Sequence, residues 1–387
     1  GPPPDAEPPE FVLNFCGSVL RHSQLGGRIR DSLFAKARLV VDVNFRMNET
    51  GRYADILLPA TGWYEKIGIK YIVSLVPYIT LGDRGAVPLA EAKPEWEIFS
   101  LLAQRVGAEA RRRGISEVKG FNGKTQDIAR LGERFSDEGR FGPDAQEEVL
   151  DLMLMASTAS WGISLEDLRR EGGAMRISGL GPEGGANGIY SDYSKEEPVV
   201  PLRDFVEKKR PYPTLTGRQQ FYIDHPWFME LDEALPTHKE PPAAGGDHPF
   251  TLTGAHTRWS IHAMWRDHDL MQRLERGEPL VCLNSGDARR KGIQEHDWVR
   301  VRNDLGFFDA RAKITGAIRP GQVHIYHAWE PYQFRNGMSH QEIAPSPLKM
   351  THLVGDYGQL HWGYAHYEPN QPDRDTRVDV ELLTGQT

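Results

Sequence analysis

Apolar residues near the start of the chain fall in short continuous runs and do not alternate with polar ones. Residues 11–16 and 39–43 are such runs, and they are rich in β-branched and aromatic side chains. Continuous runs of this length indicate strands that are buried on both faces. Residues 26–36 have helical spacing, residues 44–55 form a polar loop, and a third apolar run at 56–58 stops at Pro59. This order of strand, helix and strand predicts part of a doubly wound α/β domain.

The last third of the chain has a different pattern, in which short strands are separated by glycine turns. Strands are expected at 250–253, 280–284, 298–302, 307–315 and 322–327. A short helix follows the second of them and ends at Gly292, and Asp287 stands at its start, where a carboxylate can cap the helix. A series of short strands of this kind predicts a small closed β-barrel.

The middle of the chain gives weaker signals. Helices are expected at 94–106, 147–157 and 165–170, residues 172–193 are rich in glycine, and residues 194–247 are a proline-rich connector with one strand at 217–223. The expected organisation is therefore a linker at 1–10, an α/β segment at 11–110, an irregular helical and proline-rich region at 111–247, and a barrel domain at 248–387. The fold class is α/β plus β.

Composition narrows the possible functions. The 387 residues carry a formal net charge of −8 with no basic block, which argues against nucleic acid as a partner. No apolar run is long enough to span a bilayer. The first ten residues form an acidic, proline-rich linker with no signal peptide, so the chain is expected to be a piece of a longer protein.

Candidate metal and nucleophile sites are few. Cys16 and Cys282 each lie in an apolar strand pattern and are expected to be buried thiols, and two cysteines cannot hold an iron–sulfur cluster. His324 and His327 are three apart on an expected strand and should point to opposite faces. No nucleophile elbow, Gly-x-Gly-x-x-Gly turn or phosphate loop occurs. We therefore expect no metal ligands and no redox activity in this chain alone.

Polar side chains that suit a ligand gather in the barrel region. Eleven of the fourteen histidines occur at or beyond His248, which indicates either a ligand-facing surface or a solvated aromatic barrel surface. Asn284 and Asp287 share one turn, and together they suit the edge of a purine, although an ordinary capped turn has the same residues.

Several segments carry a family resemblance. The run from Asn284 to Val301 reads Asn-x-x-Asp-Ala-x-x-x-Gly-Ile-x-x-x-Asp-x-Val-x-Val, and it resembles the C-terminal dinucleotide-binding domain of molybdopterin oxidoreductases, the dimethyl-sulfoxide-reductase family. Residues 39–60, 251–262, 325–334 and 369–381 resemble the same family, and the last two are most similar to its branch of ethylbenzene and dimethylsulfide dehydrogenases and chlorate, selenate and nitrate reductases. The resemblance covers most of 11–100 and 246–383 and implies a double-psi β-barrel.

The resemblance implies a bis(molybdopterin guanine dinucleotide) cofactor with molybdenum, shared with an N-terminal half outside this chain. One departure is that Ser18-Val19 stands where the family usually has Asn-Pro. Catalytic residues are not assigned. The cofactor-binding candidates are Arg46, Thr50, Thr253, Gly254, His256, Thr257, Arg258, Ser260, His262, Asn284, Asp287, Asn370, Gln371 and Arg377.

The same resemblance implies the C-terminal part of a catalytic alpha subunit. Its chemistry would be hydroxylation, dehydrogenation or oxyanion reduction at molybdenum, with electrons passed to iron–sulfur clusters in the missing half or in partner subunits. The implied partners are that N-terminal half, an iron–sulfur electron-transfer subunit and a haem b subunit, in the bacterial periplasm. The alternative is a non-catalytic module that binds the dinucleotide and docks a partner. The aromatic segment 329–334 is either a partner surface or a loop packed on its own barrel.

Overall fold

The structure is a computed structural model. It describes residues 9–71, 78–120, 123–158, 162–176, 198–212, 216–223, 225–235, 237–238, 245–258, 262–275, 277–345 and 376–384. The chain forms two compact units, one built from residues 1–57 and 219–387 and the other from residues 58–218. The expected segment boundaries at residues 110 and 247 do not coincide with this division. In the part that is described, no helix is long and apolar enough to cross a membrane.

The first unit opens with a small parallel sheet. Strand β1 (Phe11–Phe15) pairs in parallel with β2 (Leu39–Asn44), and β3 (Ile56–Pro59) follows on the other side of β2. Helices α1 (Val19–His22) and α2 (Gly26–Ser32) and the 3₁₀ turn η1 (Phe34–Lys36) connect β1 to β2 and cover one face of the sheet, where Leu20, Phe34 and Val40 form the core. This arrangement confirms the expected partial α/β domain.

Helices and strands near this sheet differ in detail from the sequence expectation. The polar loop contains a one-turn helix, α3 (Glu49–Arg52), because the Asn48 side chain accepts a hydrogen bond from Gly51 N and caps it.

Cys16 is exposed, so the expectation of a buried thiol was wrong there, whereas Cys282 is buried. The reason is that Cys16 lies one residue past β1, at a turn where its φ is 55°.

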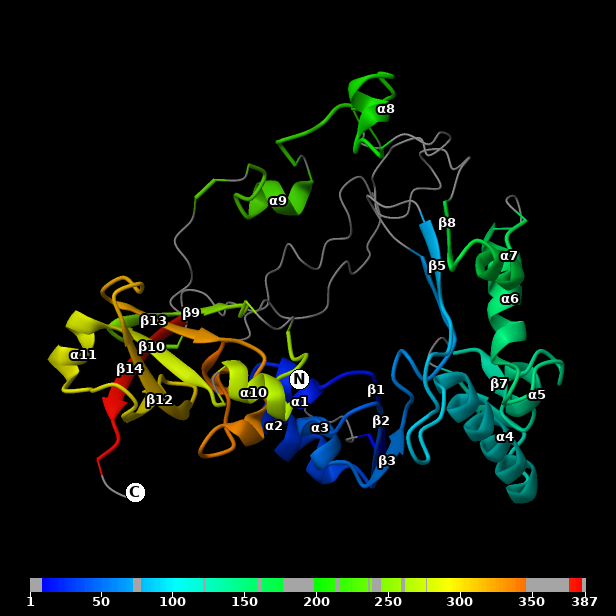
Figure 1. Cartoon of the computed structure of the whole chain (residues 1–387), viewed down its shortest axis with the longest axis horizontal. Helices are drawn as coiled ribbons and strands as arrows, with labels where there is room; N and C mark the ends of the chain where they lie inside the picture. Colours follow the sequence, from blue (N-terminus) through cyan, green and yellow to red (C-terminus); the bar gives the residue numbers. More distant parts are fainter. Residues whose placement is uncertain are drawn as a thin grey trace. The chain divides into compact units, whose positions relative to one another are not determined.

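The second half of this unit is a closed barrel of six strands in the order β10-β12-β11-β14-β9-β13 (Figure 1). The strands are β9 (Phe250–Ala255), β10 (Leu280–Asn284), β11 (Trp298–Arg302), β12 (Phe307–Thr315), β13 (Gln322–Tyr326) and β14 (Thr376–Leu382). Alternation explains the core, since Val299 and Val301 of β11 point inward and are fully buried, as are Val378 and Val380 of β14. The closed barrel was expected, but strand β14 was not.

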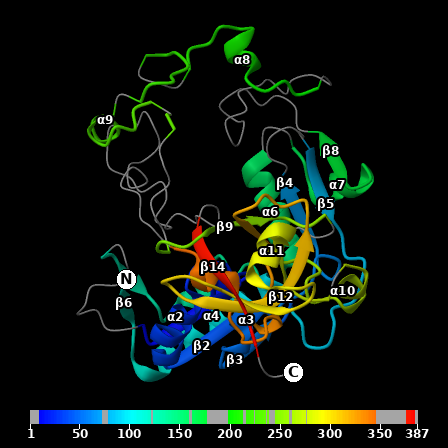
Figure 2. The same ribbon diagram turned by 90° about the vertical axis from the view of Figure 1, so that its left-hand side faces the viewer.

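Among the described residues from 219 onward, three short helices and two 3₁₀ turns accompany the barrel strands. Helix α11 (Ser285–Lys291), labelled in Figure 2, follows β10 in the sequence. It ends at Gly292, whose φ of 67° is the left-handed conformation that glycine adopts readily. Helices α9 (Pro226–Glu230) and α10 (Asp269–Glu275) and the turns η3 (Pro331–Gln333) and η4 (His340–Ile343) complete this set. Trp329 and Phe334 are buried in the barrel core, so segment 329–334 packs on its own barrel.

The second unit combines a small antiparallel sheet with helices. Its strands are β4 (Gly68–Tyr71), β5 (Tyr78–Gly82) and β8 (Ala174–Arg176), with a separate pair β6 (Glu117–Lys119) and β7 (Thr125–Asp127). Its helices are α4 (Glu95–Arg113), α5 (Leu131–Phe135), α6 (Gln146–Thr158), α7 (Leu165–Arg170) and α8 (Arg203–Val206). Three of these helices were expected, and α4 runs seven residues further than the sequence pattern indicated because apolar spacing fades on its exposed last turns.

The strand expected at 217–223 is absent. A strand needs a neighbour for its backbone groups, and here those groups are used in turns. Gly217 O accepts from Tyr212 N at 2.9 Å, and Ile223 N donates to Ala234 O at 2.8 Å.

Candidate functional site

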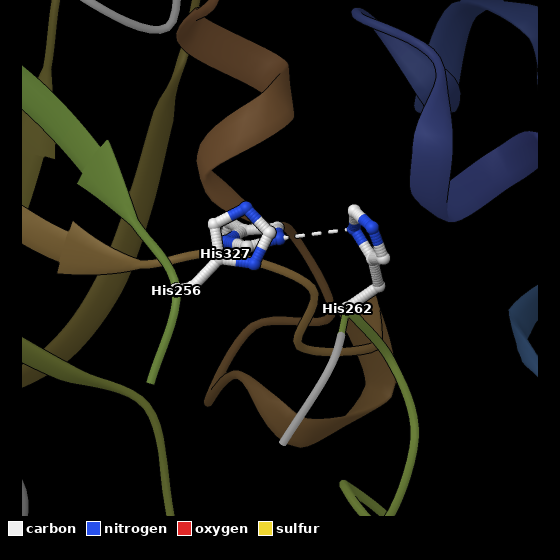
Figure 3. A group of neighbouring side chains, drawn as sticks. All are labelled: His256, His262 and His327. Atoms are coloured by element: carbon white, nitrogen blue, oxygen red, sulfur yellow. Dashed lines mark hydrogen bonds between the residues drawn. The ribbon is translucent and has the colours of Figure 1, made fainter. Parts of the chain in front are cut away.

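Two parallel barrel strands bring histidines from distant parts of the sequence together. Strand β9 pairs in parallel with β13, with Ala255 opposite Tyr326. Parallel neighbours end at the same edge, so His256 and His327, which follow these strands, become neighbours there. His262, from the loop after β9, completes the group (Figure 3). Ring centroids of His256 and His327 are 4.2 Å apart, and those of His256 and His262 are 5.0 Å apart.

Hydrogen bonds orient the central ring of this cluster. His327 Nδ1 lies 2.8 Å from Ala255 O, and because a carbonyl can only accept, Nδ1 carries the proton. Its Nε2 therefore faces His262 Nδ1, at 3.4 Å, as an acceptor in the neutral ring (Figure 3). Burial lowers the pKa of His327, and the neighbouring His256, His262 and Arg266 lower it further. A neutral ring with one oriented lone pair can bind either a metal ion or a polar heterocycle.

One nitrogen atom from each of the three rings lies within 4.8 Å of the other two, close enough for the three to be considered as metal ligands. The sequence expectation was that no metal site exists, because His324 and His327 should point to opposite faces of a strand, His256 and His262 lie six residues apart in a loop, and no cysteine or carboxylate spacing completes a ligand set. The structure adds His327 to His256 and His262. No aspartate, glutamate or cysteine joins this group within the described residues, and His256 and His262 are exposed. These features suit contact with a large ligand at least as well as a closed metal site.

A buried carboxylate links the barrel to the α/β segment beside this cluster. Glu330 is 1% exposed, and its Oε2 accepts a hydrogen bond from Glu49 N at 2.9 Å. Its Oε1 lies 3.2 Å from Arg21 Nε and 3.8 Å from the Arg46 guanidinium. Burial raises the pKa of Glu330, while the Glu49 amide and the two arginines lower it. The two arginines thus offset part of the effect of burial on the Glu330 carboxyl group.

Arg46 also fixes the loop that carries His262. Its Nη1 donates to Ala263 O at 2.9 Å and lies 3.2 Å from Asp267 Oδ1. Thr50, a second candidate of the α/β segment, is fully buried, and its hydroxyl accepts from Leu20 N at 3.1 Å. Both residues therefore hold the loops at the carboxyl ends of β1 and β2, where ligands bind in doubly wound sheets.

Asn284 and Asp287 make intramolecular contacts in the barrel. The Asn284 side chain caps helix α11 by accepting from Gly286 N at 2.8 Å, and it donates to Ile318 O at 2.7 Å. Asp287 was expected to cap the helix, and this was wrong, because Asp287 lies inside the helix. Its carboxylate, which is 1% exposed, accepts from Gly321 N at 2.8 Å and pairs with Arg290.

The remaining candidates are dispersed. The Thr253 hydroxyl lies 3.2 Å from Val323 O and 3.1 Å from His324 Nδ1, and Gly254 pairs with Ile325 within the barrel. Thr257 and the exposed Arg258 follow His256 directly, whereas Arg377 of β14 is exposed and reaches Thr251 Oγ1 at 3.3 Å. Ser260, Asn370 and Gln371 lie outside the described residues.

Buried polar atoms without partners mark the interior beside the cluster. Within the described residues, Ser18 Oγ, Gln24 Nε2, Asn336 Nδ2, His340 Nδ1 and Gln341 Oε1 are buried and make no hydrogen bond. The segments that carry them touch, since Leu25 N donates to Gln341 O at 3.0 Å. Orphaned buried groups are rare in proteins unless water or a ligand satisfies them. Sequence reasoning considered His327 only beside His324 and did not identify Glu330 or His340 as site residues, because neither belongs to a local motif.

His340 should make the protein sensitive to acid. Burial, together with His327 and Arg21, lowers its pKa from 6.5 to about 4. A group whose pKa falls on folding binds fewer protons in the native state, so the free energy of unfolding should fall as pH drops from 6.5 towards 4. We expect a loss of about 2 kcal/mol between pH 7.5 and pH 5 in urea unfolding, most of it absent in His340→Phe. An equal loss in the variant would contradict this.

Comparisons with known proteins agree with this geometry. Residues 9–105 match the family model described as Molybdopterin oxidoreductase, and residues 250–352 match the Molydopterin dinucleotide binding domain. The respiratory nitrate reductase subunit alpha of Haloferax mediterranei is 34% identical over 97% of this chain and 39% of its own length. The perchlorate reductase subunit alpha of Dechloromonas aromatica is 33% identical over 100% of this chain and 40% of its own length.

The fold is also found in a solved structure. Acetylene hydratase from Pelobacter acetylenicus superposes with a TM-score of 0.61 at 16% identity, over 96% of this chain and 44% of its own. The chain spans about two fifths of the length of the curated relatives it matches. The two matched domains imply a bis(molybdopterin guanine dinucleotide) cofactor with molybdenum. The chain therefore carries two domains of the molybdopterin oxidoreductases, and its homologues are alpha subunits of the dimethyl-sulfoxide-reductase family.

Proposed function

We propose that this chain is the C-terminal, cofactor-binding part of the catalytic subunit of a molybdenum oxidoreductase. The observation that carries the proposal is the cluster of His256, His262 and His327 at the edge of a barrel that matches a dinucleotide-binding domain. When bound, the cofactor supplies oxygen-atom transfer or hydroxylation and dehydrogenation at molybdenum. The relatives' names include nitrate, perchlorate and chlorate reductases, so reduction of an oxyanion is the reaction class we favour.

The proposed roles follow from the chemistry of each side chain. The three imidazoles offer donors and acceptors to polar fused rings, and the exposed His256 and His262 keep the cluster open to a ligand. Thr257 and Arg258, which come next in the loop, provide a hydroxyl and a guanidinium for pyrophosphate oxygens, and Arg377 adds a second guanidinium. Arg46 holds the loop that carries His262 through its hydrogen bond to Ala263 O, and Thr50 accepts a hydrogen bond from Leu20 N. Ser260, Asn370 and Gln371 remain candidates from the sequence pattern.

Buried polar atoms without hydrogen-bond partners also support cofactor binding by this chain. The Ser18 hydroxyl and the His340 Nδ1 nitrogen are both buried, and neither makes a hydrogen bond among the described residues. A large polar cofactor, or the waters that surround it, would satisfy such groups. The described residues therefore fit the cofactor that the two domains imply.

The partners we propose are those that the family resemblance implies. Two cysteines cannot hold an iron–sulfur cluster, and the family resemblance implies that electrons leave through clusters in the rest of the catalytic subunit and in an electron-transfer subunit, with a haem b subunit as a further carrier. We place the assembly in the bacterial periplasm, which is where the sequence resemblance puts it.

The test is a measurement of molybdenum and guanine nucleotide in the native assembly that contains this chain. We expect about two guanine nucleotides for each molybdenum atom. Absence of both would contradict the proposal. Guanine nucleotide without molybdenum, and without electron transfer to or from nitrate, chlorate or a reduced dye, would favour the alternative of a non-catalytic docking module.

Asp287 tests whether the α11 turn contacts guanine or only stabilises the barrel. Asp287→Ala leaves Gly321 N without an acceptor, which should cost about 1–3 kcal/mol of stability. If the carboxylate also accepts from guanine, cofactor retention should fall roughly tenfold as well. Asp287→Asn is the matched control, because it keeps an acceptor for Gly321 N. Thermal unfolding and guanine content, measured on both variants, separate the two roles, since lost stability with full cofactor content would reject the contact.

A further inference from the structure

Two of the three histidines at the barrel edge are separated as the ligands of one metal ion are. His327 Nε2 and His262 Nδ1 lie 3.4 Å apart (Figure 3). This separation is long for a hydrogen bond, since those donated by N–H groups usually span about 2.7–3.2 Å. Zinc lies about 2.0–2.1 Å from an imidazole nitrogen, so two ligands of a tetrahedral zinc ion are about 3.3–3.4 Å apart. The two nitrogens therefore have the spacing that a shared zinc ion requires.

The third ring can reach the same ion. One nitrogen atom from each of the three rings lies within 4.8 Å of the other two. The ring of His256 packs against both neighbours, with its centroid 4.2 Å from that of His327 and 5.0 Å from that of His262. His256 and His262 are exposed, and the terminal torsion of a histidine side chain is broad, so a small turn of the ring costs little. All three imidazoles can thus direct a nitrogen to one point.

His327 is oriented in the way that is usual for a metal-binding histidine. Its Nδ1 donates to Ala255 O at 2.8 Å, and its backbone N–H donates to the same oxygen at 3.0 Å. Metal-binding histidines almost always donate their second ring N–H to a carbonyl or carboxylate group, which fixes the tautomer and directs the other nitrogen at the ion. Ala255 ends β9, which pairs with β13 beside His327, so this ligand is in place before an ion arrives.

The types of ligand select the class of ion. No carboxylate or thiolate joins the three imidazoles within the described residues. Imidazole suits zinc, copper and nickel, whereas calcium and magnesium prefer oxygen ligands. Three protein ligands leave a fourth position for water, as in open zinc sites. Arg266 donates to His327 O at 3.1 Å, and its positive charge weakens the binding of a cation. We therefore expect an ion that exchanges with solution.

We propose that His256, His262 and His327 bind a divalent ion of the zinc class when the cofactor is absent, and that this ion and the cofactor exclude each other. The exclusion rests on the proposed function, in which the same rings contact the cofactor. A nitrogen lone pair that binds zinc cannot also accept a hydrogen bond, so the two ligands compete. In the cofactor-free protein the ion joins the loop of His262 to the barrel edge, and it has to leave before the cofactor binds there.

The test is a zinc titration of the assembly that contains this chain, prepared without its cofactor and washed with a chelator. We expect about one tightly bound zinc ion for each copy of the chain. His327→Ala and His262→Ala should each weaken this site about 100-fold or more, because loss of a group that only supports a metal ligand already costs about 10–100-fold. His262 is exposed, so its variant removes a ligand without disturbing the barrel core.

The matched control is His248→Ala, which changes a barrel histidine outside the cluster and should leave zinc affinity unchanged. If the wild type binds no zinc, or if His327→Ala and His262→Ala bind it as tightly as His248→Ala does, the inference is overturned. The second of these results would assign the bound zinc to scattered surface histidines.

The cofactor-loaded assembly provides a second measurement. Its zinc affinity at this site should be at least about tenfold lower than that of the cofactor-free assembly, and equal affinity would overturn the exclusion. Guanine nucleotide content separates this inference from the proposed function. Guanine lost in His327→Ala, with no zinc bound by the cofactor-free wild type, contradicts the metal site alone. Zinc lost in His327→Ala, with full guanine content in the loaded variant, supports the metal site and contradicts the cofactor contact.

Discussion

Replacing His327 with alanine should lower the guanine nucleotide content of the native assembly about tenfold or more. His327 is the half-buried member of the three-histidine cluster, and its Nδ1 is held by Ala255 O, so its Nε2 is oriented before any ligand arrives. The variant loses that oriented group and also frees the rings of His256 and His262, which pack against it. Hydrogen bonds of this kind contribute about 0.5–1.5 kcal/mol each, and loss of two of them corresponds to the expected change.

His248 provides the control for this variant. It belongs to the same barrel domain and has its own partner, with Nε2 3.1 Å from Asp304 Oδ1, but it is not part of the cluster. His248→Ala should therefore keep its guanine nucleotide. If both variants retain full cofactor content, or if both lose it equally, the cluster is not a cofactor contact. Adding zinc to the cofactor-loaded assembly checks the other use of three imidazoles, because zinc retained by the wild type and lost in His327→Ala would identify a metal site instead.

Replacing Glu330 with alanine should lower the free energy of unfolding by about 3 kcal/mol. Removing one partner of a buried ion pair leaves an uncompensated charge, and in this case Arg21 and Arg46 both lose their shared carboxylate. Glu49 N loses its acceptor at the same time. The change should therefore loosen the α/β segment from the barrel, and urea unfolding measures it.

An exposed pair shows what a carboxylate contributes without burial. Asp31 pairs with Arg30 on the surface, where its side chain is 68% exposed, and Asp31→Ala should leave the urea unfolding midpoint close to that of the wild type. Glu330→Gln separates charge from hydrogen bonding, because the amide still accepts from Glu49 N. A Glu330→Ala variant as stable as Asp31→Ala would show that the buried network contributes nothing.

Much of the local structure could be predicted because it depends on short-range patterns. The buried run at 39–43 became β2, and the alternation of Trp298-Val-Arg-Val-Arg302 became β11 with both valines inside. Helix α7 occupies residues 165–170 as its spacing indicated, and it is held by a capping box of Ser164 and Asp167. The barrel also follows from its strands, since several short strands of this kind have few ways to bury their apolar faces.

The strand expected at 217–223 and the cap expected for α11 were both predicted wrongly for one physical reason, which is competition for backbone hydrogen bonds. Residues 217–223 have the composition of a strand, but their amides and carbonyls are taken up in turns. Asn284, and not Asp287, caps α11, because the helix begins at Ser285, whereas a cap at Asp287 requires it to begin at Ala288, and the Asn284 side-chain Oδ1 accepts from Gly286 N. Such choices depend on geometry at the level of a single residue, which hydrophobic periodicity does not encode.

The sequence by itself determined the classes of structure and the family. Continuous apolar runs specified a parallel α/β segment, alternating ones a barrel, and two cysteines ruled out a cluster within the chain. These properties follow from neighbours within a few residues and from composition. Tertiary structure alone decided which side chains meet. His327 joins His256 across 71 residues because β9 and β13 are parallel and end at one edge, and Glu330 meets Arg21 across 309 residues because the barrel packs on the α/β segment. Strand pairing and domain packing set those distances, and no local pattern records them.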